Sequence, residues 1–280
     1  MVADMRNTTK MNIQGMMVGN GATNWDFDVS PSFPETVFNF NLIPSKYLNF
    51  MQENNCNYYF NDFKNHSGPA TCDAVWDKVQ NLTGDLYWYD LYRNEANGAL
   101  LVEDRMGMSV VAGVEKHYKK GMTVEEYTPW MAPHVNSKAV MNDFLSDYVN
   151  NETVRTAMHI PAEVQAWEMC SSTLQYSVQN EASMWIYPIL RGAGIRTMFY
   201  SGDTDGAVPT YGTKRWIKEL GWDVKADWRP WLTDGQVSGY IEQYDGLDFI
   251  TVKGTGHMAP QWKRQEVTSM ITNWISEKEI

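Results

Sequence analysis

Cysteine is scarce in this sequence of 280 residues: it occurs three times, and no two of these cysteines form a Cys-x-x-Cys motif. A zinc site of the common cysteine-rich kind is therefore not expected. Long apolar runs are also missing, since no stretch approaches the roughly 20 apolar residues that a helix needs to span a bilayer. We expect no metal ion, no cofactor and no membrane partner.

Basic residues are fewer than acidic ones: 23 Lys and Arg stand against 34 Asp and Glu, which gives a net charge of −11. An acidic surface repels the phosphate backbone of nucleic acids, so nucleic acid is not an expected partner. In one interpretation the acidity serves solubility, and in another it fits residence in an acidic compartment. Both interpretations stay open at this point.

The cysteines and the glycosylation sequons concern the cellular route of the protein. Cys56 and Cys72 flank a polar segment, as a disulfide that closes a surface loop would. Cys170 is then left over, either as a buried free thiol or as a residue whose partner is missing. Together these features favour the secretory route, because four Asn-x-Ser/Thr sequons begin at Asn7, Asn65, Asn81 and Asn151.

The first 20 residues do not support that route, because they contain neither the basic region nor the apolar core of a signal peptide. We therefore expect either a cytosolic protein or a chain that does not begin where the folding unit begins.

Two turns in the last third of the chain carry the ionisable residues of greatest interest. The apolar stretch 195–200 precedes Ser201-Gly202-Asp203-Thr204-Asp205, and the apolar stretch 249–252 precedes Gly254-Thr255-Gly256-His257. Each pattern is typical of a strand that ends in a tight turn. An acid on one turn and a histidine on a later one match the last two members of a Ser-Asp-His triad in α/β-hydrolase chain order.

Periodic apolar patterns predict strands and helices in alternation, which indicates an α/β sheet with flanking helices. We expect an ordered loop over residues 22–40, an extended segment over 85–92 and a hairpin turn at Asp245-Gly246. The region 100–148 is ambiguous and suggests short helices of a cap. The strands are expected at 11–19, 195–200, 236–244 and 249–252, and the helices at 46–53, 71–79, 151–159, 184–190, 211–220 and 261–276.

The nucleophile of such a triad is expected on a Gly-x-Ser-x-Gly elbow before the acid, and this motif does not occur in the sequence. Ser109, in Gly107-Met108-Ser109-Val110-Val111, precedes both Asp205 and His257. It lacks the second glycine of the elbow, so we regard it as a poor substitute.

Several segments in fixed order resemble the serine carboxypeptidase family of α/β-hydrolases. They cover most of the chain, strongly after residue 150 and weakly between 95 and 145. The matching segments are Gly15 to Gly21, Trp167 to Ser171, Tyr200 to Pro209, Trp228 to Trp231 with Gly235 to Tyr240, and Phe249 to Pro260.

The resemblance implies a role for each residue of the two turns. Asp205 would orient the histidine, His257 would be the general base, and Asp203 would be a structural acid of its turn. Met258 would line the substrate site. The alternatives are an Asx-type turn for either acid, an ordinary turn histidine, and plain packing for the methionine.

The resemblance also implies the organisation of the protein. The family carries its nucleophile a few tens of residues before its Gly-Asn strand, so we expect the chain to be the C-terminal portion of a longer protein. It would be a single α/β-hydrolase-like domain over residues 1–280, incomplete relative to the family, with a cap or insertion at about 40–150. The partner of Cys170 would then lie in the missing part.

By the same resemblance, the parent protein would remove C-terminal residues from peptides and would reside in the lysosome or vacuole or be secreted. A companion N-terminal chain or a homodimer would supply what this chain lacks. Two other interpretations stay open. One is an acyltransferase or a hydroxynitrile-lyase-like enzyme of the same family, and the other is a non-catalytic relative kept for binding.

Overall fold

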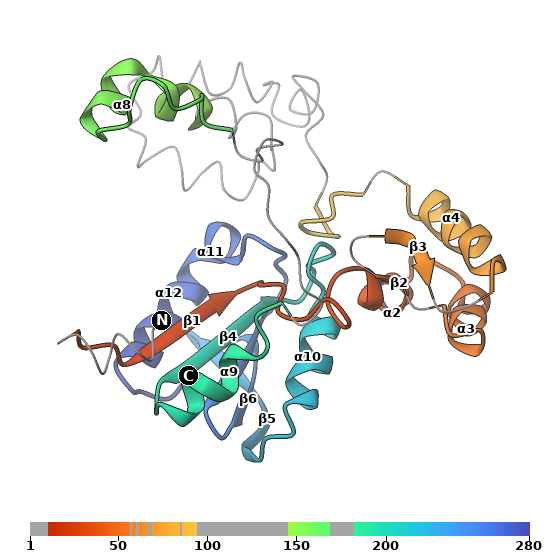
Figure 1. Cartoon of the computed structure of the whole chain (residues 1–280). Helices are drawn as coiled ribbons and strands as arrows, with labels where there is room; N and C mark the ends of the chain where they lie inside the picture. The colour runs from red at the N-terminus through yellow and green to blue at the C-terminus, as the bar shows by residue number, and fades with distance from the viewer. Residues whose placement is uncertain are drawn as a thin grey trace. The chain divides into compact units, whose positions relative to one another are not determined.

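The structure of the protein is a computed structural model that describes residues 11–56, 58–59, 62–66, 69–84, 86–93, 145–168 and 182–280. The chain divides into two compact units: residues 1–92 together with 178–280 form the first, and residues 93–177 form the second (Figure 1). The prediction of a single domain with an insertion at about 40–150 stays a prediction. Asn7, Ser109 and Cys170 lie outside the described residues.

The first unit is built on a five-stranded sheet in the order β1-β4-β7-β6-β5. Strands β1, β4 and β7 run parallel, whereas β6 and β5 are antiparallel to their neighbours. The sheet is therefore mixed, and the expected α/β class with flanking helices is confirmed. The strands are β1 (Gly15–Gly19), β4 (Arg196–Gly202), β5 (Val224–Thr233), β6 (Gln236–Tyr244) and β7 (Leu247–Val252).

Alternate side chains of the central strands enter two different cores. On β4, Met198 faces one apolar cluster and Phe199 the other; on β7, Ile250 and Phe249 divide in the same way. This alternation follows from the two-residue period of a strand. Both faces of the central strands are therefore covered, as in an α/β protein.

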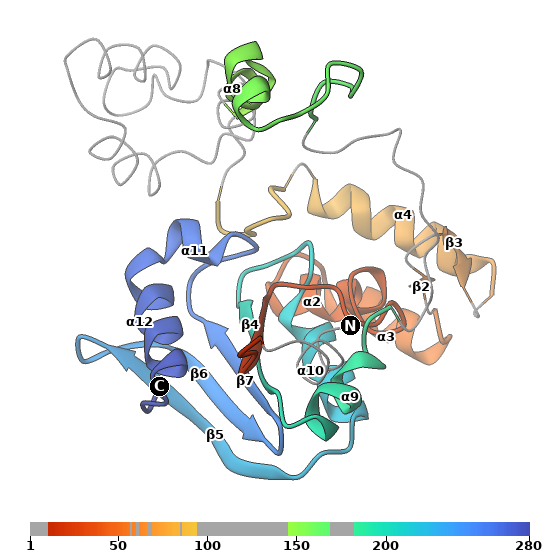
Figure 2. The same cartoon turned by 60° about the vertical axis from the view of Figure 1, so that its left-hand side comes forward.

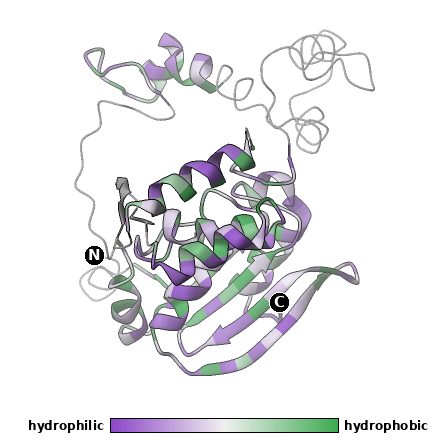
Figure 3. Cartoon of the chain, turned by 90° about the vertical axis from the view of Figure 1, so that its right-hand side faces the viewer, coloured by the Kyte–Doolittle hydropathy of each residue, from purple (hydrophilic) through white to green (hydrophobic). Residues whose placement is uncertain are grey.

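Helices cover the two faces. The cluster that contains Met198 is completed by the C-terminal helices, and the cluster that contains Phe199 by Trp216 and Ile217 of the helix after β4. Figure 2 shows α11 and α12 on one side of the sheet and α9 and α10 on the other. These helices are α9 (Ile186–Gly192), α10 (Thr210–Glu219), α11 (Ala259–Trp262) and α12 (Arg264–Ile275). Hydrophobic and hydrophilic residues alternate along the helices, as one-sided burial requires (Figure 3).

The segment after β1 departs from its prediction as a loop. Residues Ser30–Ser32 form a 3-10 helix, η1, and Phe33–Asn39 form helix α2. Pro34 lies in the first turn of α2, where its fixed φ favours a helix start, and Val37 is fully buried. The high Asn, Asp and Pro content of residues 22–40 hid this short helix.

The elements that follow contain the expected disulfide. Cys56 and Cys72 are bonded, with their Cα atoms 5.6 Å apart, and both side chains are buried. This confirms the predicted pairing. The neighbouring elements are α3 (Ser45–Glu53), β2 (Tyr58–Tyr59), β3 (Asp62–His66) and α4 (Thr71–Thr83).

The described part of the second unit contains a helical stretch over residues 145–150 and helix α8 (Glu152–Ala157). The side chain of Asn151 accepts a hydrogen bond from the backbone N–H of Thr153 and so caps α8, which lies within the helix predicted over 151–159. Across the described ranges of the whole chain, no helix combines the length and the apolar character that a bilayer crossing requires.

Candidate active site

The turns that carry the candidate catalytic residues meet at one edge of the sheet. Strands β4 and β7 are parallel and in register, so that Gly202 pairs with Val252 at their carboxyl ends. Strand β1 ends beside them, with Gly19 paired to Tyr200. Residues after these three strands are therefore neighbours, and ligand sites of open α/β sheets form at such an edge.

His257 and Asp205 are in direct contact at this edge. The imidazole Nδ1 lies 2.7 Å from Oδ2 of Asp205. The carboxylate is completely buried, whereas 29% of the His257 side chain is exposed. The other ring nitrogen, Nε2, makes no hydrogen bond to any residue that the structure describes. The arrangement gives a histidine held at one nitrogen and open at the other.

The carboxylate of Asp205 has three further donors. Its Oδ1 accepts the backbone N–H groups of Ala207 and Val208 at 2.8 and 3.0 Å. Its Oδ2 accepts the side-chain amide of Asn20 at 2.9 Å. Asp205 thus forms an Asx-type turn and also contacts the histidine, and its role in orienting the histidine stays a prediction.

Asn20 is a site residue that sequence reasoning missed as such. The sequence pattern marks it only as the end of the first strand, although a polar residue directly after a buried strand is a signal for a site residue. Its side chain is buried and its φ of 49° is in the left-handed region, where asparagine is tolerated. The turn geometry after β1 aims the amide at Asp205.

Asp203 lies on the same turn but faces a different partner. Its Oδ1 accepts the backbone N–H of Gly254 at 2.7 Å. Burial raises the pKa of this carboxyl, and the backbone donors of Gly254 and Thr255 oppose the shift. Asp203 joins the turn after β4 to the turn after β7, which is the geometry of a structural acid.

Residues 86–92, the described part of the segment predicted as extended at 85–92, are instead a series of turns that lies against the histidine. The carbonyl of Tyr89 accepts the backbone N–H of His257 at 2.6 Å, and the two rings lie 5.2 Å apart. Its aromatic residues suggested a strand, but the described part of this segment joins no sheet.

The remaining candidate residues are spread over the fold. Met258 follows the histidine, caps α11 and is half-buried. Asn81 is exposed on α4, Asn151 is exposed at the start of α8, and Asn65 lies in β3. Glycosylation of these asparagines and a substrate role of Met258 stay predictions. Among the described residues, no three His, Cys, Asp or Glu side chains gather where a metal ion could bind.

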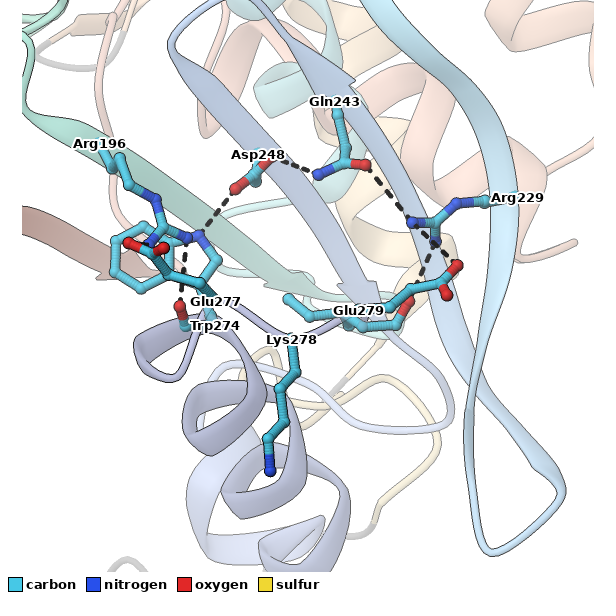
Figure 4. A pocket seen from close by; sticks show the side chains of 9 residues that line it. Arg196, Arg229, Gln243, Asp248, Trp274, Glu277, Lys278 and Glu279 are labelled. Carbon is cyan, nitrogen blue, oxygen red and sulfur yellow. Dashed lines mark hydrogen bonds and ion pairs between the residues drawn. The ribbon is translucent and has the colours of Figure 1, made fainter.

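One cavity borders the turn that carries Asp205, and another lies far from it. One of about 300 Å³ is bordered by Asp203 and Asp205 and, on the side of α10 and the hairpin, by Lys214, Trp228 and Tyr240. The rings of Trp228 and Tyr240 are stacked, 5.6 Å apart. Another of about 550 Å³ lies at the opposite end of the strands, beside Arg196 and Asp248 (Figure 4). The second cavity is remote from the acid–histidine pair and takes no part in it.

The sequence of this chain is similar to that of known proteins over most of its length. The sequence model of the family described as serine carboxypeptidase matches residues 2–277. Serine carboxypeptidase 1 of Hordeum vulgare is 28% identical over 293 residues, which cover 95% of this chain and 57% of that protein. Serine carboxypeptidase-like 33 of Arabidopsis thaliana is 27% identical over 282 residues, which cover 96% and 55%.

A solved structure shares the fold. It is that of Kex1(Δ)p, a prohormone-processing carboxypeptidase from Saccharomyces cerevisiae, with a TM-score of 0.63 and 16% identity. The match covers 99% of this chain and 58% of that one. The chain therefore spans little more than half the length of these relatives.

Proposed function

Because this chain belongs to the serine carboxypeptidase family, we propose that it supplies the acid and the base of a serine-type peptidase that removes C-terminal residues from peptides. The observation that carries the proposal is the 2.7 Å contact between His257 Nδ1 and the buried Asp205. It joins the two residues that the sequence pattern selects, at the sheet edge where sites of this fold class form.

The chemistry follows from the state of each ring nitrogen. A carboxylate only accepts hydrogen bonds, so Nδ1 carries the proton and Nε2 holds a free electron pair. Nε2 takes the proton of a serine hydroxyl as its oxygen attacks the peptide carbonyl, and then gives that proton to the leaving amine. Water repeats the two steps on the acyl-enzyme. Asp205 keeps the tautomer and stabilises the imidazolium that forms.

In our proposal, the serine nucleophile of this reaction does not belong to the 280 residues of this chain. The sequence contains no Gly-x-Ser-x-Gly elbow, and Ser109 lacks its second glycine. Loss of a triad nucleophile costs on the order of 10⁶ in kcat, so the acid–histidine pair alone would not turn over substrate measurably. A companion N-terminal chain or segment is the partner that the proposal requires.

The disulfide supports the cellular side of the proposal. The Cys56–Cys72 bond fits an oxidising compartment, as on the secretory and vacuolar routes. Exposed sequon asparagines on α4 and before α8 are accessible to glycosylation on that route.

The test measures hydrolysis of an amino-blocked dipeptide and labelling by an organophosphate serine probe. The 280-residue chain is assayed alone and together with the protein segment encoded upstream of Met1. We expect release of a free amino acid and labelling of an upstream serine only in the combined sample. His257→Ala should abolish both signals. His159→Asn, which changes an exposed histidine of the second unit, should leave them intact.

Other outcomes contradict the proposal in distinct ways. Labelling of Ser109 in the chain alone, abolished by His257→Ala, would make Ser109 the nucleophile. Transfer of the acyl group to an alcohol in place of water would indicate an acyltransferase. Peptide binding by the combined sample without any product would indicate a non-catalytic relative.

A further inference from the structure

A short segment of the first unit bridges the two turns of the acid–histidine pair through its backbone. The N–H of Leu91 donates to the carbonyl of Thr204 at 2.9 Å, and the carbonyl of Trp88 accepts from Gly206 at 2.8 Å. Both contacts flank Asp205. On the other turn, the carbonyl of Tyr89 accepts from the N–H of His257. Residues 88–91 therefore contact the turn of the acid and the turn of the base.

One buried carboxylate in this segment makes the same connection through its side chain. Asp90 is 1% exposed. Its Oδ1 accepts the hydroxyl of Thr204 at 2.8 Å, and its Oδ2 accepts the backbone N–H of Gly256 at 3.2 Å. Thr204 precedes Asp205 in the chain, and Gly256 precedes His257. Asp90 also accepts the N–H of Tyr92 at 3.1 Å, which fixes the carboxylate in its own turn.

The backbone around Asp90 is packed closely against both turns. A Cβ atom on Gly256 would lie 1.9 Å from the carbonyl oxygen of Tyr89 and 2.7 Å from Cα of Asp90. A Cβ atom on Gly202 would lie 2.2 Å from the carbonyl oxygen of Gly256. The two turns and the segment touch backbone to backbone, so a shift of Asp90 is passed to both turns.

We propose that Asp90 is a positioning residue that keeps Asp205 and His257 in register. It binds the residue before each of them and thereby fixes the distance between the two side chains. The inference rests on the proposed function only for calling the pair catalytic. Asp90 does not touch the reacting atoms, and its effect passes through Thr204 and Gly256.

The proposal differs from a general contribution to stability, because it ties Asp90 to one contact. Displacements of about 1 Å at a reacting group are known to cost about a hundredfold in rate. A carboxylate that accepts from both turns at once limits such displacement. An apolar residue of the same size would fill the space and leave Thr204 Oγ1 and Gly256 N without this acceptor.

The test uses Asp90→Asn in the 280-residue chain, with the Nδ1 proton of His257 observed by NMR on ¹⁵N-histidine-labelled protein. The asparagine oxygen can still accept from Thr204, but its amide group turns a donor toward the N–H of Gly256. One connection is kept and one is lost. We expect the Nδ1 proton of His257 to exchange with water about tenfold faster, as for the loss of one hydrogen bond to a charged group.

A matched control is Asp248, near the start of strand β7, whose opposite end leads into the turn that carries His257. Asp248 on β7 accepts Trp274 Nε1 at 2.7 Å and Gln243 Nε2 at 2.9 Å, a comparable connection remote from the pair (Figure 4). Asp248→Asn should destabilise the chain and leave the exchange of the His257 proton within a factor of about two. An equal acceleration in both variants would overturn the proposal, since the effect would then be general loosening.

Thr204→Val keeps the proposal testable if Asp90→Asn does not fold. It removes the hydroxyl donor with little change in shape, and we expect about threefold faster exchange. In the double variant Asp90→Asn, Thr204→Val, the two effects should not add, because they act on one network. If Asp90→Asn folds and its exchange rate is unchanged, the proposal is overturned. If Asp90→Asn does not fold, an unchanged exchange rate in Thr204→Val overturns it. The readout needs no turnover, so the proposed function can fail while this inference stands.

Discussion

Asn20 and His257 bind the same oxygen atom of Asp205. Asn20 precedes Asp205 in the sequence, and His257 follows it. The amide of Asn20 lies 2.9 Å from Oδ2, and the imidazole Nδ1 lies 2.7 Å from it. With two backbone donors on Oδ1, the buried carboxylate accepts four hydrogen bonds. A carboxylate with this number of donors is held in one orientation, and its orientation sets that of the imidazole.

Asn20→Gly should lower the free energy of unfolding by about 2 kcal/mol, because it removes a hydrogen bond to a buried charged group. Glycine adopts the φ of 49° without strain, so the change isolates the side chain. Urea unfolding measures the effect. Asn41→Gly is the control, since Asn41 is exposed and has a φ of 60°. Equal losses in both variants would show that the Asp205 contact contributes nothing.

Asp28→Asn should remove a pH dependence of stability. Burial raises the pKa of Asp28 to about 7 from 3.8, against the N–H groups of Thr23 and Asn24 and the charge of Arg215. Between these two values the unfolded chain is ionised while the folded chain stays protonated. Stability from this group is therefore present below about pH 4 and is lost as the pH rises to about 7, by up to about 4 kcal/mol.

Urea unfolding of the unaltered chain and of Asp28→Asn at several pH values between 4 and 8 checks this. Relative to the variant, the unaltered chain should become less stable as the pH rises. Asp26→Asn, an exposed acid two residues away, should keep the slope of the unaltered chain. A parallel dependence in the unaltered chain and in Asp28→Asn would contradict the assignment.

Reduction of the Cys56–Cys72 disulfide should lower stability by about 3 kcal/mol. The bond closes a loop with a sequence separation of 16, and a loop of this length restricts the unfolded chain by about that amount. Denaturation with and without dithiothreitol measures it. The double variant Cys56→Ala, Cys72→Ala should unfold alike under both conditions. A reductant effect of similar size in the double variant would sink the assignment to this bond.

Gly202→Ala should disrupt the site, because the added Cβ would lie 2.2 and 2.4 Å from the carbonyl oxygens of Gly256 and Thr255. Backbone atoms cannot move aside, so we expect a loss of about 3 kcal/mol or failure to fold. Gly192→Ala is the matched control: nothing lies within 4 Å of its Cβ position. In helix α9 this change should stabilise by about 0.5 kcal/mol. Thermal melts of both variants decide between these outcomes.

Regular elements were predictable where one face is apolar and the turn residues are explicit. Helix α10 and strand β6 fall within a residue or two of their expected bounds, and Asp245-Gly246 marks the hairpin. Strand β5 is not predicted from the sequence, although the pair Asp234-Gly235 is a hairpin signal. In the structure both residues have positive φ, as a tight two-residue hairpin turn requires. Its side chains are mostly exposed, so no alternation announced it.

The candidate site was predictable only in part, for a physical reason. Asp205 and His257 lie on turns whose local sequences are distinctive, and strand pairing brings them together. Asn20 and Asp90 act by contacts across 185 and 166 positions in the chain, and such pairings leave no local signal. The aromatic residues around Asp90 favoured a strand, and the buried carboxylate among them was overlooked.

The parallel pairing of β1 with β4 brings together residues that are made at very different times. Asp205 and His257 are 52 residues apart, whereas Asn20 and Asp205 are 185 apart. Contacts over long separations form slowly, because the closure of a large loop comes first. During synthesis at about 5–20 residues per second, β1 emerges roughly 10–35 s before β4 exists. Asn20 is thus made long before Asp205, and its contact with Asp205 closes the largest of these loops.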